Sequence, residues 1–161
     1  MTRFHRPPRS RSSSLFAVLL FVLVPLLRPL DLCAAPMVSL QARVFLASNQ
    51  PGVAPDPRLA SLIEQLRKAL PYSNFQLLGS PSGRTGLGQA WKTELPGGRT
   101  LELMPTAIEQ GTIQLQARIV QRNETLVSTI LRLQSGGLPV VIGGPAYQNG
   151  VLVIVISASV P

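Results

Sequence analysis

Residues 151–156 read Val-Leu-Val-Ile-Val-Ile, an unbroken run of large apolar side chains close to the C-terminal end of the sequence. Most of these side chains are β-branched, which favours an extended strand over a helix, and the run is far too short for a membrane-spanning helix. Successive side chains of a strand point to opposite faces, so both faces of this strand are apolar. A strand that is buried on both sides has this composition. We therefore expect residues 151–157 to lie at the centre of a sheet.

Alternating strand patterns occupy much of the chain that precedes this run. Residues 38–47 place Val38, Leu40 and Ala42 on one face, and residues 112–121 alternate in the same way. Further strands, separated by turn signals, are expected at residues 74–78, 89–95, 99–104, 125–134 and 138–142. The stretch 79–88 is rich in Gly and Ser and is predicted to be a flexible loop.

One amphipathic helix is predicted between residues 56 and 71. Asp56 is a suitable N-cap, Pro57 suits the first helical position, and Pro71 ends the run. The apolar side chains form one stripe at helical spacing: Leu59, Leu62, Ile63, Leu66 and Leu70. This stripe must be buried, and a sheet is the only candidate partner. The predicted fold is therefore α+β: a mainly antiparallel β-sheet of about seven to eight strands with one amphipathic helix packed on it.

Residues 1–34 have the pattern of a cleavable signal peptide. Four arginines and no acidic residue lie within the first 14 positions, and an apolar run follows from Leu15 to Val24. The small residues around Ala34 and Ala35 are those that a signal peptidase recognises, so cleavage is expected after one of these two alanines. Residues 35–161 are then expected to form a single β-rich domain.

Two alternatives to cleavage exist for this segment. It could be retained as an anchor, but its apolar run is shorter than the roughly 20 residues that a membrane-spanning helix needs. Cys33 could carry a lipid, but Leu32 directly precedes it, where a lipoprotein signal has a small residue, and Asp31 comes before that. We therefore expect an exported protein, periplasmic or associated with the outer membrane, with no stable membrane span after cleavage.

The net charge of the sequence is +8, but half of it belongs to the leader. Five arginines and Asp31 lie in residues 1–34, which leaves ten basic and six acidic side chains, a net charge of +4, for the remainder. An excess of this size is ordinary for a soluble domain, and the basic residues are scattered along the sequence. The charge pattern therefore gives no support to nucleic-acid binding.

The types of residue in 35–161 restrict the chemistry that the domain can perform. The one histidine, His5, and the one cysteine, Cys33, both lie in the leader. Catalysis by Ser-His-Asp or Cys-His groups is thereby excluded, and so are zinc sites built from His or Cys. Paired carboxylates for glycoside hydrolysis could come only from a few glutamates, which are more simply explained as surface charges: Glu94, Glu102, Glu109 and Glu124. We expect no enzyme activity and no cofactor.

Four residues are candidates for binding or for a special backbone role. Trp91 and Tyr147 could form an aromatic surface for a sugar or peptide, although packing against the core is the simpler explanation of each. Gly143 and Gly144, followed by Pro145, are predicted to form a sharp structural turn with positive φ at the end of a buried strand.

The C-terminal region resembles a known family. Residues 135–145 read Ser-Gly-Gly-Leu-Pro-Val-Val-Ile-Gly-Gly-Pro, and Gly-Val-Leu-Val-Ile follows at 150–154. This segment is similar to the β-hairpin region of outer-membrane secretins, in which a turn glycine leads into a valine-rich strand that ends in Gly-Gly. The resemblance implies a secretin-associated module of a type II or type III secretion system or a pilus, since the chain is too short for the ring-building domains and the pore. It implies binding of a partner through sheet or loop contacts and no catalytic residue.

Two functions follow as expectations. The first is a non-enzymatic assembly or accessory module of the cell envelope, which binds an envelope protein or self-associates through exposed strand edges. The second is a periplasmic domain that binds a glycan or a peptide. A clustered, exposed aromatic groove would favour the second function, whereas a flat polar face with a free strand edge would favour the first.

Overall fold

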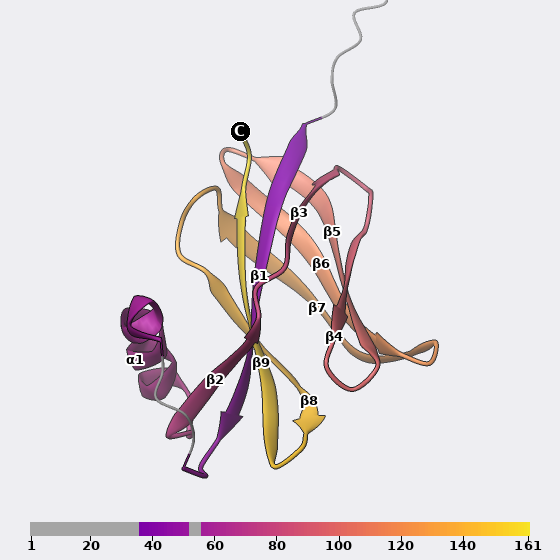
Figure 1. Ribbon diagram of the computed structural model, residues 1–161. Helices are drawn as coiled ribbons and strands as arrows, with labels where there is room; N and C mark the ends of the chain where they lie inside the picture. The colour runs from indigo at the N-terminus through magenta and orange to yellow at the C-terminus, as the bar shows by residue number, and fades with distance from the viewer. Residues whose placement is uncertain (1–35, 52–55) are drawn as a thin grey trace, which may run out of the picture. The chain divides into compact units, whose positions relative to one another are not determined.

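The computed structural model describes residues 36–51 and 56–161, and the expected signal peptide at 1–34 lies outside these residues. Within them the chain forms nine strands in two antiparallel sheets and one α-helix, so the expected α+β class is confirmed (Figure 1). Sheet A comprises β1 (Met37–Ser48), β2 (Asn74–Gly79), β3 (Ser82–Gly86), β8 (Val140–Tyr147) and β9 (Gly150–Ser159). Sheet B comprises β4 (Trp91–Leu95), β5 (Arg99–Glu109), β6 (Thr112–Gln121) and β7 (Glu124–Gln134).

The apolar run at residues 151–156 lies in the interior of sheet A, as expected. β9 pairs with β1 on one side and with β8 on the other, in the order β2-β1-β9-β8. One face of β9 contributes Leu152, Ile154 and Ile156 to a core shared with sheet B. The opposite face contributes Val153 and Val155 to a second cluster. Both faces are buried because sheet B covers one of them and the helix covers the other.

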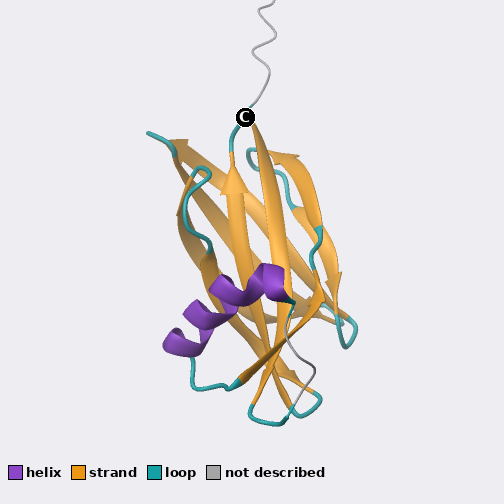
Figure 2. Cartoon of the chain, turned by 60° about the vertical axis from the view of Figure 1, so that its left-hand side comes forward, coloured by secondary structure: helices purple, strands orange, loops and turns teal. Residues whose placement is uncertain are grey.

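The helix forms where the sequence predicts it. The Asp56 carboxylate accepts a hydrogen bond from the Arg58 N–H at 2.9 Å and caps a short 3-10 turn, η1 (Pro57–Leu59), which continues into α1 (Ala60–Ala69). Leu66 is 1% exposed and packs with Phe45 and Phe75. Figure 2 shows α1 lying across the outer face of sheet A.

α1 covers only part of that outer face. Along β1 the outward residues are Ser39, Gln41 and Arg43, followed by Phe45 and Ala47. Along β9 they are Ser159 and Ser157, followed by Val155 and Val153. The change from polar to apolar therefore falls at the paired residues Arg43 and Val155, and the apolar half is the half that packs against the helix.

The flexible loop predicted at residues 79–88 contains a strand instead. β3 pairs antiparallel with the first half of β1, and β2 pairs with the second half on the same side of β1. Gly83 lies opposite Leu40, and a Cβ added to Gly83 would overlap the Trp91 indole. The glycine therefore permits close packing rather than flexibility.

Candidate interaction surface

The structure places Trp91 at the edge of the core. It is the first residue of β4, lies opposite the fully buried Leu103, and packs against the core between the sheets. Its indole covers Gly83 of β3 at the side where the two sheets approach each other. Trp91 is half-buried and contributes mainly to closing this side of the sandwich.

Tyr147 lies at the opposite end of β4. It is the last residue of β8, is half-buried, and its ring comes within 3.4 Å of the Cβ position at Gly97, in the turn that follows β4. Its hydroxyl accepts a 3.4 Å hydrogen bond from the Gln148 side chain. Trp91 and Tyr147 are thus separated by the length of β4 and do not share one aromatic surface.

The turn predicted at Gly143 and Gly144 is not formed. Both residues lie inside β8, and neither has a φ in the left-handed region. A β-bulge falls between Gly143 and Ala146, where β8 has one more residue than β9. A Cβ at Gly144 would lie 3.0 Å from the Leu152 backbone oxygen, whereas Gly143 has open space around it. Gly144 therefore serves close approach of two strands, and the reversal of the chain comes later, at Gln148 and Asn149.

The bulge coincides with a link between the sheets that the sequence did not suggest. Arg99 Nη2, from the start of β5, donates a 2.9 Å hydrogen bond to the Ala146 carbonyl oxygen of β8. Arg99 Nη1 also donates to the Pro96 carbonyl oxygen at 3.3 Å. This guanidinium therefore joins the β4–β5 turn of sheet B to the end of β8 in sheet A.

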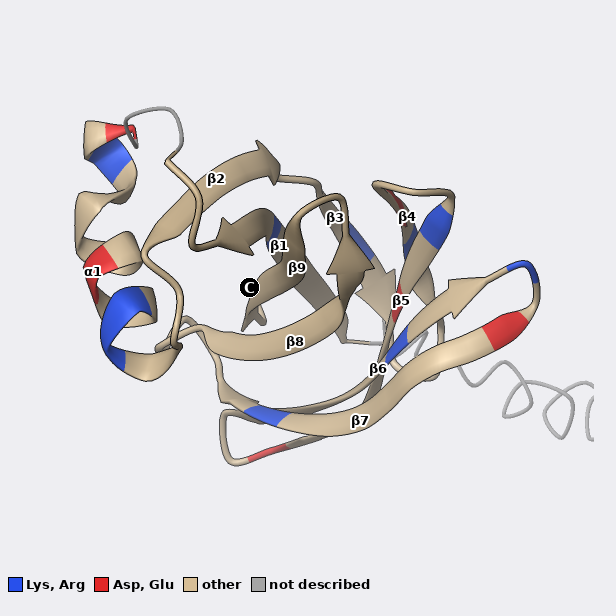
Figure 3. Cartoon of the chain, turned by 90° about the horizontal axis from the view of Figure 1, so that it is seen from below, with Lys and Arg blue, Asp and Glu red and all other residues tan. Residues whose placement is uncertain are grey.

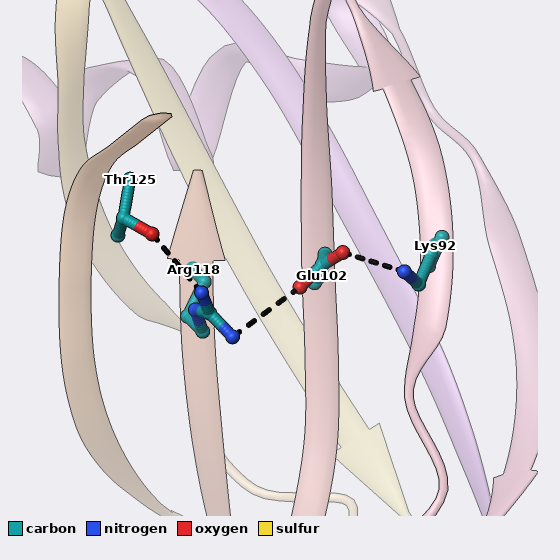
Figure 4. A network of polar contacts seen from close by, with 4 residues as sticks. All are labelled: Lys92, Glu102, Arg118 and Thr125. Atoms are coloured by element: carbon teal, nitrogen blue, oxygen red, sulfur yellow. Dashed lines mark hydrogen bonds and ion pairs between the residues drawn. The ribbon is translucent and has the colours of Figure 1, made fainter. Parts of the chain in front are cut away.

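The outer face of sheet B carries a polar network across all four of its strands (Figure 4). Lys92 Nζ lies 2.7 Å from Glu102 Oε1, and Arg118 Nη1 lies 3.8 Å from Glu102 Oε2. Arg118 Nη2 donates a 3.0 Å hydrogen bond to Thr125 Oγ1. Exposed ion pairs contribute little individually, but this series connects β4, β5, β6 and β7 in one line. Glu102, considered above as a catalytic carboxylate, is held between two cations.

Three of the four outer edges of the sheets have features that discourage pairing with another chain. β4 is short and carries the exposed Lys92. β8 contains Pro145 and the bulge described above. The edge formed by β2 and β3 is interrupted by a bulge at β2 and by Pro81 between the two strands. Short edges, lysine, proline and bulges are the usual protections of an edge strand.

β7 is the fourth edge and has little of this protection. It is 11 residues long, contains neither proline nor lysine, and pairs only with β6 among the described strands. Leu126 is the extra residue of a bulge near its start and is 37% exposed, and Ile130 is 63% exposed. Figure 3 shows an acidic segment towards one end of β7 and a basic one towards the other. The sequence predicts this strand at 125–134, but not that it lies at an edge.

No family model matches this chain. Nor is any curated protein or solved structure significantly similar to it.

The described residues hold neither a candidate metal site nor a candidate membrane span. No three His, Cys, Asp or Glu residues among them gather closely enough to hold an ion. In the same part of the chain, no helix has the length and apolar character needed to cross a bilayer.

Proposed function

We propose that this protein is a non-enzymatic, exported module of the cell envelope that acts by associating with another protein or with itself, in a secretin-like secretion or pilus context. The long edge strand β7, which contains neither proline nor lysine, is the observation that carries the proposal. A strand with one free side offers a row of backbone donors and acceptors to an additional strand. The outer face of sheet B, which carries the polar network from Lys92 to Thr125, lies next to this edge.

Three features of the sequence support the same function. Residues 1–34 resemble a signal peptide, which implies export. Residues 35–161 contain no imidazole or thiol for catalysis. The segment that resembles the secretin hairpin region, residues 135–154, contains most of the β8–β9 hairpin.

Fractionation and cross-linking in the native host test this function. We expect the chain in the periplasmic or outer-membrane fraction, cross-linked either to a secretin-type outer-membrane protein or to a second copy of itself. A cytosolic location would contradict export. An exported chain that cross-links to neither protein would contradict its role as an assembly partner.

One observation favours the alternative, a periplasmic domain that binds a glycan or peptide. The uncovered half of the outer face of sheet A contains a shallow hollow of about 540 Å³. Its lining includes hydroxyl, amide and guanidinium groups from Ser39, Gln41, Ser82, Arg84, Ser157 and Ser159. Such groups can donate to and accept from sugar hydroxyls or peptide carbonyls. Sedimentation with purified peptidoglycan that is lost in Arg84→Ser and retained in Ile130→Lys would support this alternative over association through β7.

A further inference from the structure

The two sheets differ in the kind of charge that they carry. In the five strands of sheet A only Arg43 and Arg84 are charged, and no residue is acidic. The acidic side chains of the described residues lie elsewhere: four belong to strands of sheet B, and the other two, Asp56 and Glu64, lie at the start of the helical segment and within it. Within the described part of the chain, neither Arg43 nor Arg84 forms an ion pair. Sheet A therefore carries two guanidinium groups that no acidic side chain contacts.

Two rows of polar side chains cross β3, β1 and β9 on the half of the outer face that α1 leaves uncovered. In strand order, the rows are Arg84, Ser39 and Ser159, and then Ser82, Gln41 and Ser157. The two rows share one face because side chains two residues apart on a strand point the same way. All six side chains line the hollow of about 540 Å³ described above.

Arg43 continues this polar surface along β1. Its Nη2 donates a 3.4 Å hydrogen bond to Gln41 Oε1, so its guanidinium reaches towards the hollow. Four residues of strand separate Arg43 from Ser39, which lies opposite Arg84, so the backbone positions of the two arginines are about 14 Å apart along the sheet. Two cations at this spacing, with hydroxyl and amide groups between them, fit a polymer of repeated anionic units better than a single small anion.

The groups on this surface favour a polysaccharide over a peptide. β1 and β9 are both paired on their two sides, so a peptide cannot add to either of them as a further strand. The side chains of the two rows are all polar, so they offer no apolar pocket for a peptide side chain. Sugar hydroxyls both donate and accept hydrogen bonds, and the serine hydroxyls and the Gln41 amide can do the same.

We propose that the uncovered half of the outer face of sheet A binds an anionic polysaccharide. Its carboxylates pair with Arg43 and Arg84, and its hydroxyls contact the serines and Gln41 between them. This inference rests on the alternative function given above, and it names the charge of the ligand and the residues that recognise it. It does not depend on association through β7, which belongs to the other sheet.

Calorimetric titration with polymers of known charge tests the class of ligand. The exported, processed chain should bind polygalacturonate, which has one carboxylate on each sugar, and should bind its fully methyl-esterified form at least about tenfold more weakly. Polyglutamate places carboxylates on a peptide, and vesicles of phosphatidylglycerol place phosphates on a membrane, and both should bind more weakly than polygalacturonate. Equal binding of the esterified polymer would overturn the role of charge. Equal or tighter binding of polyglutamate or of the vesicles would overturn a polysaccharide as the occupant.

Substitution of the arginines tests the residues that recognise the charge. Arg84→Gln and Arg43→Gln should each weaken binding of polygalacturonate by about tenfold, because each removes one charge-assisted contact. The matched control is Arg122→Gln, which removes the same charge from the exposed turn between β6 and β7. It should leave the affinity within about twofold at physiological salt, where distant exposed charges are screened.

Removal of hydroxyls tests the sugar contacts separately from charge. The double variant Ser39→Ala with Ser157→Ala keeps the net charge and should weaken binding of polygalacturonate by about fivefold, while leaving the weaker binding of polyglutamate unchanged. Circular dichroism establishes that each variant is folded. An unchanged affinity for polygalacturonate in this double variant, or equal losses in the three arginine variants, would show unspecific attraction and overturn the site.

Failure of this inference can be distinguished from failure of the proposed function. Cross-linking in the envelope reports on association, and Ile130→Lys alters β7 without changing sheet A. A chain that does not bind polygalacturonate but cross-links to an envelope protein loses only the site proposed here. A chain that binds polygalacturonate through Arg84 yet cross-links to no envelope protein keeps the site and loses the proposed role in assembly.

Discussion

Gly144 is required for a different reason from the one that the sequence suggests. The sequence suggests a glycine pair that turns the chain, but the backbone at Gly144 is extended and the absent side chain is what matters. Gly83 is required for the same reason, because a side chain at this position would overlap the Trp91 indole. The local sequence shows that a glycine is present and that its backbone can adopt many conformations. Only the fold shows whether the position needs glycine for an unusual φ or for the close approach of a neighbouring group.

Substitution at the two adjacent glycines should separate these requirements. Gly144→Val should lower the free energy of unfolding by about 1–3 kcal/mol, because its Cβ would lie against the Leu152 backbone, which cannot move as a flexible side chain can. Gly143→Val should change it by less than about 0.5 kcal/mol, because the space around Gly143 is open. Urea unfolding curves measure both values. Equal destabilisation by the two substitutions would argue against packing as the cause.

The strands and the helix could be predicted from the sequence to different extents. The strand at Thr112–Gln121 has the expected bounds, and the helix begins and ends close to the expected residues, because alternation, capping and helical spacing are local signals. β3 was missed, since Ser82–Gly86 has no apolar face and forms a strand by pairing with β1. Long-range pairing also decides that β7 is an edge, so the candidate interaction surface could not be located from sequence alone.

The helix should contribute substantially to stability through one buried side chain. Leu66→Ala should lower the free energy of unfolding by about 2–5 kcal/mol, because Leu66 is enclosed by the apolar cluster between α1 and sheet A. Lys68→Ala, on the exposed side of the same helix, is the control and should change stability by less than about 0.5 kcal/mol. Denaturant titration of the two variants compares them, and a similar small effect for both would show that α1 packs loosely.

At the scale of the molecule, the division into two sheets was not predicted. Each strand pattern specifies a buried and an exposed face, but the same pattern is consistent with one sheet or with two packed face to face. The helix covers part of the outer face of sheet A. The inner face of sheet A is also apolar, and it is buried against sheet B. The total amount of apolar sequence indicates a well-formed core without showing how it is layered.

The mature protein should begin at Ala35 or Pro36. Cleavage after Ala34 or Ala35 is expected because small residues follow the apolar run at the spacing that signal peptidase requires. Intact mass spectrometry of the chain purified from the envelope fraction measures the N-terminus directly. A mass that includes Cys33 and an attached lipid would identify a lipoprotein instead.

The boundary at Arg43 and Val155 on the outer face of sheet A has a consequence for how the strands find their alignment. A slip of one residue between β1 and β9 would turn core residues outward and is strongly disfavoured, but a slip of two preserves the alternation. In this protein a two-residue slip in one direction would bring Val153, beneath α1, opposite Arg43 in place of Phe45. The charged side chain would then lie beside the apolar surface on which the helix docks. Packing of α1 on sheet A therefore disfavours a two-residue slip between β1 and β9, which the alternating pattern of the strands alone would allow.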